Sequence, residues 1–225
     1  DCLATFDCLR ALGVELSLQR GERGAHLIVE GRGPDGLRQP AGVLDARNSG
    51  TTMRLLAGLL AGRPFLSILT GDSSLLSRPM GRIVAPLRAM GAQIRGRDGD
   101  TLAPLTIRGG PLRGIDYRLP VASAQVKSAL LLAGLQAEGE TRLTEPAPSR
   151  DHTERMLRAM GAPLRSDGEA LVLSPPGRLA PLSMRVPGDI SAAAFWLIAG
   201  ALSNPNKTPS GGLNWIPIIS IFTSP

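Results

Sequence analysis

A five-residue string that occurs three times constrains the fold of this chain more than any other feature. Leu-Arg-Ala, then Leu or Met, then Gly, stands at residues 9–13, 87–91 and 157–161, so the copies lie about 70 to 80 residues apart. Each copy ends an amphipathic helical pattern, and its Gly falls where the residue after a helix adopts a left-handed conformation. A strand, a polar turn and a second strand follow, which predicts hairpins over residues 14–31, 92–109 and 162–173.

A second string alternates with the first and predicts the rest of the repeat. Leu, then Leu or Ile, then Ala and Gly, occupy residues 55–58, 131–134 and 197–200. Each copy belongs to an almost wholly apolar segment, which indicates a buried helix. The repeat is therefore strand, buried helix, strand, amphipathic helix, strand, strand. We predict an α/β (α+β) fold of βαβαββ units packed around buried helices, with most of one unit, two whole units and the start of a fourth.

Composition excludes several classes of protein. The chain has 225 residues, and 43% of them are apolar, which is ample for a hydrophobic core. No apolar stretch approaches the roughly 18 residues that a membrane span needs, so we expect a soluble protein. Cys2 and Cys8 stand close together with no cluster of His or Cys around them. This arrangement argues against a zinc site and a disulfide scaffold and favours a reducing, cytoplasmic compartment.

The charge pattern favours small anionic substrates. The net charge is +6, and all but two of the 25 basic residues are Arg. Because the arginines are scattered singly and no aromatic residues alternate with them, we expect no nucleic-acid partner. Arg binds carboxylate and phosphate groups well, so anionic substrates account for the excess charge. His26 and His152 stand alone, and we expect both to be structural or exposed.

Each expected buried helix begins with a cluster of small polar residues. These clusters are at residues 48–52, 123–127 and 187–191. The free N–H groups and positive dipole end of a helix suit phosphate or carboxylate. Simple N-capping by Asn48 or Ser49, by Ser123 and by Asp189 explains the same residues. The residues alone leave both interpretations open.

The amphipathic helices carry charged residues at their expected starts. Pro79 stands where the first helical residue would be, with Arg78 beside it, and Pro86 predicts a kink or a late helix start. Asp151 and Glu154 have the spacing of a capping box. An Arg at such a position is either a solvated surface charge or an anion ligand, and this choice also stays open.

Several of these segments together resemble the 5-enolpyruvylshikimate-3-phosphate (EPSP) synthase family. The resemblance covers roughly residues 1–202 in one register, and its motifs are specific in combination. The segments that carry it are residues 48–56 (Asn-Ser-Gly-Thr-Thr-Met-Arg-Leu-Leu), 71–75, 78–80, 86–91, 123–134 (beginning Ser-Ala-Gln-Val-Lys), 150–154 (Arg-Asp-His-Thr-Glu) and 186–189 (Val-Pro-Gly-Asp).

The resemblance implies transfer of the enolpyruvyl group of phosphoenolpyruvate to the 5-hydroxyl of shikimate 3-phosphate, on the route to chorismate and aromatic amino acids. It further implies a cytoplasmic monomer without a metal or a cofactor. The residues that would bind shikimate 3-phosphate are Ser123, Ala124, Gln125, Ser149 and Arg150. The residues that would bind phosphoenolpyruvate, and hence the inhibitor glyphosate, are Asn48, Gly50, Thr51, Arg78 and Gln125.

The resemblance also implies a two-domain enolpyruvyl transferase fold, of which this chain holds one domain. We expect that domain over residues 1–186, the start of the second over 187–202, and a divergent tail without Arg, Asp or Glu over 203–225. The family's Lys-Ser motif and the acidic residues that transfer protons have no counterpart here. Because Gln125 and Lys127 cannot replace a carboxylate base, the catalytic residues are unknown, and we expect this chain alone to be catalytically incomplete.

Two alternatives remain at this stage. UDP-N-acetylglucosamine enolpyruvyl transferase shares the fold, but it has a reactive Cys on a loop, whereas this sequence has no Cys after Cys8. The other alternative belongs to a different class, a non-catalytic remnant that only binds an anion.

Overall fold

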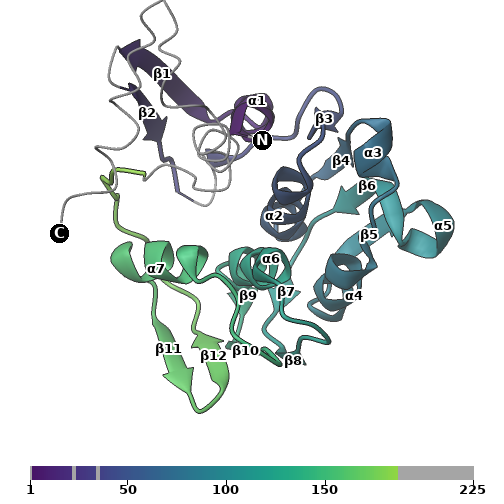
Figure 1. Ribbon diagram of the computed structural model, residues 1–225, viewed down its shortest axis with the longest axis vertical. Coiled ribbons are helices and arrows are strands. Elements are labelled where there is room, and N and C mark those ends of the chain that lie inside the picture. Colours follow the sequence, from purple (N-terminus) through teal and green to yellow (C-terminus); the bar gives the residue numbers. More distant parts are fainter. Residues whose placement is uncertain (1, 22–23, 34–35, 187–225) are drawn as a thin grey trace, which may run out of the picture. The chain divides into compact units, whose positions relative to one another are not determined.

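The computed structural model describes residues 2–21, 24–33 and 36–186 (Figure 1). One compact unit extends to Leu182, and a second begins at Ser183. The expected third buried helix at 197–200, its polar start at 187–191 with Asp189, the start of a second domain and the 203–225 tail all lie outside the described residues. The domain boundary at residue 186 stays a prediction.

The described helices and strands follow the order expected from the repeats. The last three elements of a first repeat are α1 (Cys2–Ala11), β1 (Glu15–Gly21) and β2 (Gly24–Glu30). The second repeat comprises β3 (Leu44–Asp45), α2 (Gly50–Ala61), β4 (Leu66–Thr70), α3 (Ser73–Leu76), α4 (Gly81–Ala89), β5 (Gln93–Gly96), α5 (Arg97–Asp100) and β6 (Leu102–Arg108). The third comprises β7 (Leu112–Arg113), β8 (Asp116–Arg118), α6 (Ala124–Gly134), β9 (Ala137–Glu138), β10 (Thr141–Thr144), α7 (His152–Ala159), β11 (Leu164–Asp167) and β12 (Ala170–Leu173).

The second and third repeats build sheets of the same topology, which confirms the predicted α/β fold of βαβαββ units. Their strand orders are β3-β4-β6-β5 and β8-β10-β12-β11. In each sheet the first two strands are parallel, and the other two pairs are antiparallel. A further parallel pair, β7 with β9, aligns Leu112 with Ala137. The first repeat contributes only a helix and a hairpin to the described residues, less than the sequence pattern suggested.

The three repeated glycines adopt the conformation that their position predicts. Gly13, Gly91 and Gly161 have φ values of 87°, 110° and 80°. Side chains rarely tolerate this left-handed region, so Gly is favoured where the chain leaves each amphipathic helix for the hairpin.

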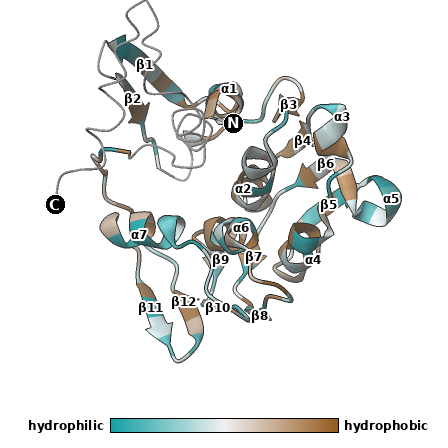
Figure 2. Ribbon diagram, viewed as in Figure 1, coloured by the Kyte–Doolittle hydropathy of each residue, from teal (hydrophilic) through white to brown (hydrophobic). Residues whose placement is uncertain are grey.

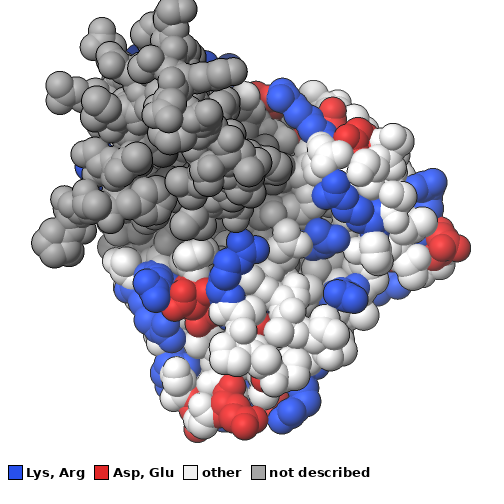
Figure 3. Space-filling view, viewed as in Figure 1, with Lys and Arg blue, Asp and Glu red and all other residues white. Residues whose placement is uncertain are grey.

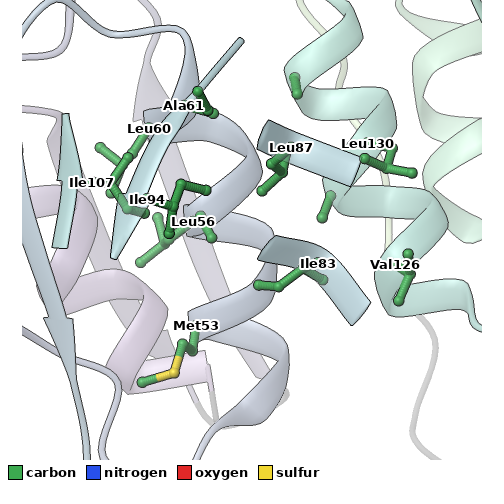
Figure 4. Packing of buried hydrophobic residues seen from close by; sticks show 14 of the residues in the cluster. Met53, Leu56, Leu60, Ala61, Ile83, Leu87, Ile94, Ile107, Val126 and Leu130 are labelled. Carbon is green, nitrogen blue, oxygen red and sulfur yellow. The ribbon is translucent and has the colours of Figure 1, made fainter. Parts of the chain in front are cut away.

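The core forms around α2 and α6, which confirms that these two helices are buried. Leu56 and Leu60 of α2 face Ile94 and Ile107 of the sheet, and residues of α4 and α6 complete the cluster (Figure 4). The two helices touch where a Cβ on Gly58 would lie 2.1 Å from the carbonyl oxygen of Ala129. Outside this core the chain is more polar, as Figure 2 shows for α5, which is hydrophilic, in contrast to β12, which is hydrophobic. Within the described part, no helix is long and apolar enough to cross a membrane.

Two helix starts differ from the sequence-based expectation. Pro79 is not the first residue of a helix, because it pairs with Leu102 in an isolated β-bridge while the Met80 N–H donates to the Thr101 carbonyl at 2.7 Å. The helix begins at Gly81 and runs through Pro86. The helix therefore starts after Pro79, which makes the predicted first residue wrong, and Pro86 lies inside the helix, where it removes one helical hydrogen bond.

The capping box was also a wrong prediction. Asp151 occupies the N-cap position of α7, but its side chain makes no capping hydrogen bond. It accepts instead from Arg155 Nε at 2.8 Å, and this hydrogen bond lowers the pKa of Asp151. The side chain of Glu154 approaches Lys127 of α6. Charged partners, one on the next turn of α7 and one on α6, thus compete successfully with the backbone N–H groups.

Candidate functional site

Serine caps both buried helices that the structure describes. Ser49 Oγ accepts from the Thr52 N–H at 3.1 Å at the start of α2. Ser123 Oγ accepts from the Val126 N–H at 3.4 Å at the start of α6. The capping interpretation is therefore confirmed for these two serines. Capping accounts for one residue in each of these two polar clusters and does not explain the others.

The side chain of Asn48 connects the start of α2 to the segment that carries Arg78. Asn48 Nδ2 donates to Asp72 Oδ2 at 2.7 Å, and Asn48 Oδ1 accepts from Arg78 Nη2 at 2.6 Å. Arg78 Nη1 also donates to the Asn48 carbonyl at 3.2 Å. The hydrogen bond from Asn48, the Leu75 N–H and the charge of Arg78 together lower the pKa of Asp72. These bonds hold the guanidinium of Arg78 beside the N-terminus of α2.

Gln125 links the two buried helices. Its Nε2 donates to Thr51 Oγ1 at 2.8 Å, and its Oε1 accepts from Arg54 Nη1 at 2.9 Å. Arg54 Nη2 also donates to the Pro79 carbonyl at 3.2 Å. The side chain that reaches out from α6 is thus fixed in orientation by two residues of α2.

Gly50 provides the space in which this cluster forms. A Cβ at Gly50 would lie 2.5 Å from Arg54 Nη1 and 3.5 Å from Arg78 Nη1. Both guanidinium groups therefore approach the backbone at the first turn of α2. The structure brings together all five residues expected to bind phosphoenolpyruvate: Asn48, Gly50, Thr51, Arg78 and Gln125.

The electrostatics of this cluster favour an anion. Burial lowers the pKa of Arg54, and the positive charges of Arg78 and Arg82 lower it further. None of these three arginines forms an ion pair within the described residues. Figure 3 shows Lys and Arg surface where α2, α3 and α4 meet, with no acidic surface between these patches. A carboxylate or phosphate there would relieve the repulsion and accept several charge-assisted hydrogen bonds.

A second cluster surrounds the start of α6. Ser123 is the N-cap and Ala124 is the first helical residue. The Ser123 N–H and the Ser149 hydroxyl both donate to Glu145 Oε1, at 3.3 and 2.6 Å. Four of the five residues expected at the shikimate 3-phosphate site therefore lie at or next to this helix start. Arg150 is exposed and makes none of the hydrogen bonds that join the others.

Sequence reasoning missed three residues of these clusters. Arg54 stands one helical turn after Gly50, so the spacing of four residues could have shown that it shares a helix face with the expected ligands. The partnership of Lys127 with Glu145 has no comparable signal in the sequence, because 18 residues separate them. Among the described residues, no group of three or more His, Cys, Asp or Glu could hold a metal ion.

The paired βαβαββ repeats, with an arginine cluster at the N-terminus of one buried helix and serines at the other, define an α/β protein of repeated units. Residues 1–207 match the family model described as EPSP synthase (3-phosphoshikimate 1-carboxyvinyltransferase). The chain therefore belongs to the EPSP synthase family.

Individual relatives agree with this assignment. The chain is 61% identical over 205 residues to a 3-phosphoshikimate 1-carboxyvinyltransferase of Chloroflexus aurantiacus, and 56% identical over 202 residues to one of Geobacillus kaustophilus. Each alignment covers 90% of this chain and 46% of the relative. A solved EPSP synthase of Acinetobacter baumannii superposes with a TM-score of 0.79 at 49% identity, over 90% of this chain and 45% of that one. The chain thus spans about half the length of the relatives that it matches.

Proposed function

We propose that this chain supplies the binding residues of a 3-phosphoshikimate 1-carboxyvinyltransferase. In this reaction the 5-hydroxyl oxygen of shikimate 3-phosphate forms a bond to C2 of phosphoenolpyruvate. The bond from C2 to the phosphate oxygen breaks, phosphate leaves, and the hydroxyl proton is released. The observation that carries the proposal is the link made by Gln125, which joins the arginine cluster of α2 to the serine cluster of α6.

Each of the two clusters would bind a different substrate. Arg54 and Arg78 present N–H groups beside Gly50, and they would bind the carboxylate and phosphate of phosphoenolpyruvate. Ser123 and Ser149, with Ala124 and the exposed Arg150, would bind the phosphate of shikimate 3-phosphate at the start of α6. Gln125 lies between them and would contact both substrates, which brings the reacting groups together.

Proton transfer requires groups outside these clusters. Neither the amide of Gln125 nor the ammonium of Lys127 can act as a carboxylate base. We therefore infer that the described residues bind and orient the substrates, and that the isolated 225-residue chain turns over slowly or not at all. The non-catalytic, anion-binding remnant predicts the same absence of turnover, but it does not require both substrates to bind.

We further infer that the protein acts as a cytoplasmic monomer without nucleic acid, membrane or cofactor. One chain supplies both clusters, so a second copy is not needed to complete them. UDP-N-acetylglucosamine enolpyruvyl transferase is disfavoured, because its reactive Cys has no counterpart here. Burial, with Asp45 and Asp7 nearby, raises the pKa of Cys8 to about 11, which keeps this thiol protonated and unreactive.

Titration calorimetry with the 225-residue chain tests the proposal. Shikimate 3-phosphate is added first, and phosphoenolpyruvate is added to the saturated chain. We expect Gln125→Ala to weaken both binding steps by about tenfold or more, because it removes a hydrogen-bonding side chain from both subsites. Gln93→Ala, at an exposed position of β5, is the matched control and should change neither. Loss of binding in both variants, or in neither, would contradict the proposed site.

A further inference from the structure

Lys127 is a buried charge that the proposed reaction does not use. Its ammonium group lies in α6, 2.6 Å from Glu145 Oε2 and 2.6 Å from Glu154 Oε1. The three side chains are only 6%, 13% and 11% exposed. Burial alone would lower the pKa of Lys127, but hydrogen bonding to the two carboxylates outweighs burial and raises it. Lys127 is therefore charged and holds Glu145 in a fixed position.

The other oxygen of Glu145 occupies the donors of the proposed phosphate site. Glu145 Oε1 accepts from the Ser149 hydroxyl at 2.6 Å and from the Ser123 N–H at 3.3 Å. Burial raises the pKa of Glu145, but the hydrogen bonds from Lys127 and Ser149 outweigh it and lower the pKa overall. Glu145 is thus an ionised acceptor at the point where a substrate phosphate would need donors.

Each of these donors has a single hydrogen. The Ser149 hydroxyl cannot donate fully to a carboxylate and to a phosphate oxygen at once, and the same holds for the Ser123 N–H. Two negative groups that share these donors would also repel each other. Glu145 and an incoming phosphate therefore compete.

We propose that Glu145 is a resident anion that occupies the phosphate-binding donors of Ser123 and Ser149 until the phosphate of the substrate displaces it. This inference rests on the proposed function of the same site. Lys127 binds the other oxygen of Glu145, Oε2, so the carboxylate can release the two serines and keep its ion pair with Lys127. The exchange sets a threshold for binding, because a ligand oxygen must be a stronger acceptor than a carboxylate. A dianionic phosphate meets this requirement, and a neutral hydroxyl does not.

The cluster offers a matched pair of variants that remove the same charge. Glu145→Gln removes the competing anion and leaves the 2.6 Å contact between Lys127 and Glu154. Glu154→Gln also removes one carboxylate from Lys127, but the hydrogen bonds from Ser123 and Ser149 go to Glu145 and not to Glu154. A purely structural role would make the two substitutions equivalent. Thermal melting of each variant shows whether it folds.

The experiment measures binding of shikimate 3-phosphate and of inorganic phosphate to the 225-residue chain and to both variants. We expect Glu145→Gln to bind both ligands about tenfold more tightly than wild type, and Glu154→Gln to stay within about twofold. Ser149→Ala removes one of the contested donors. In that background the gain from Glu145→Gln should shrink to about threefold or less, since the two residues act through one hydrogen bond.

The outcomes separate this inference from the proposed function. If wild type binds shikimate 3-phosphate but folded Glu145→Gln binds it equally or more weakly, the resident anion is refuted and the site stands. If wild type does not bind and Glu145→Gln does, the inference is supported. If no folded variant binds either ligand, both the inference and the shikimate 3-phosphate site fail. If Glu154→Gln bound the ligands as tightly as Glu145→Gln does, the inference would also be overturned, because the result would show a general effect of charge.

Discussion

Replacement of Gly58 by Ala tests whether the contact between α2 and α6 sets the spacing of the site. A Cβ at Gly58 would lie 2.1 Å from the carbonyl oxygen of Ala129, and 2.7 and 2.8 Å from its carbonyl carbon and Cα. All three are backbone atoms, so no side-chain rotation can relieve the overlap. The helices must separate, and their separation also stretches the 2.8 Å hydrogen bond from Gln125 to Thr51.

The expected loss in the free energy of unfolding of Gly58→Ala follows from two opposing effects. Overpacking of a close-packed core costs about 1 to 3 kcal/mol, and a backbone overlap belongs at the upper end of that range. Ala is favoured over Gly inside a helix by about 1 kcal/mol, because the unfolded chain has less conformational freedom to lose. The net loss is about 2 kcal/mol. For a chain of this size it lowers the melting temperature by roughly 4 to 8 °C.

Thermal unfolding followed by circular dichroism measures this loss, and Gly81→Ala is the control. Gly81 is the first residue of α4, and a Cβ there would lie 3.8 Å from Thr101 Cγ2, which is an ordinary contact. We expect Gly81→Ala to stay within about 0.5 kcal/mol of wild type. A Gly58→Ala chain that melts at or above the wild-type temperature would refute the argument that the backbone of α6 limits this position.

Two further predictions concern charged groups. Arg54→Gln should weaken phosphoenolpyruvate binding about tenfold or more, because it removes the charge and the donor to Gln125, whereas Arg95→Gln on β5 should change it less than twofold in the same titration. Hydrogen bonds from Arg88 and the Gly96 N–H lower the pKa of Asp100 from 3.8 to about 2, so Asp100 stabilises the fold above about pH 4 and loses that effect as the pH falls towards 2. Denaturation midpoints of wild type should therefore exceed those of Asp100→Asn at pH 6 and converge with them towards pH 2; a gap that does not change with pH would contradict this assignment.

The sequence was most informative where one local pattern determines one local structure. The three glycines after the amphipathic helices and the apolar runs of α2 and α6 are such patterns, and each indicates its conformation or burial without reference to the rest of the chain. The capping box failed because Asp151 had an alternative partner in Arg155, and Glu154 had one in Lys127. Nothing within residues 151–154 shows which partner prevails.

In the candidate site, too, local features could be predicted from the sequence and long-range contacts could not. Asn48, Gly50 and Ser123 stand at helix starts, where the local sequence already indicates free N–H groups. The contacts that make these residues a site connect Arg54 with Gln125 and Lys127 with Glu145, across 71 and 18 residues. The first pair follows from the packing of one repeat on the next, and the second from packing within the third repeat, so both became visible only in the folded chain.

The two proposed anion sites should bind their ligands in different ways. α2 and α6 occupy equivalent positions in consecutive repeats, and each is capped by a serine. Beyond the cap they diverge. Arg54 of α2, with Arg78 and Arg82 nearby, makes no ion pair within the described residues, so an anion at the proposed site would bind by direct attraction, which salt weakens. α6 carries Lys127 already neutralised by two carboxylates, so an anion there would bind by the proposed exchange with Glu145. Binding of phosphoenolpyruvate should therefore depend more steeply on ionic strength than binding of shikimate 3-phosphate, although both sites stand at the same place in their repeats.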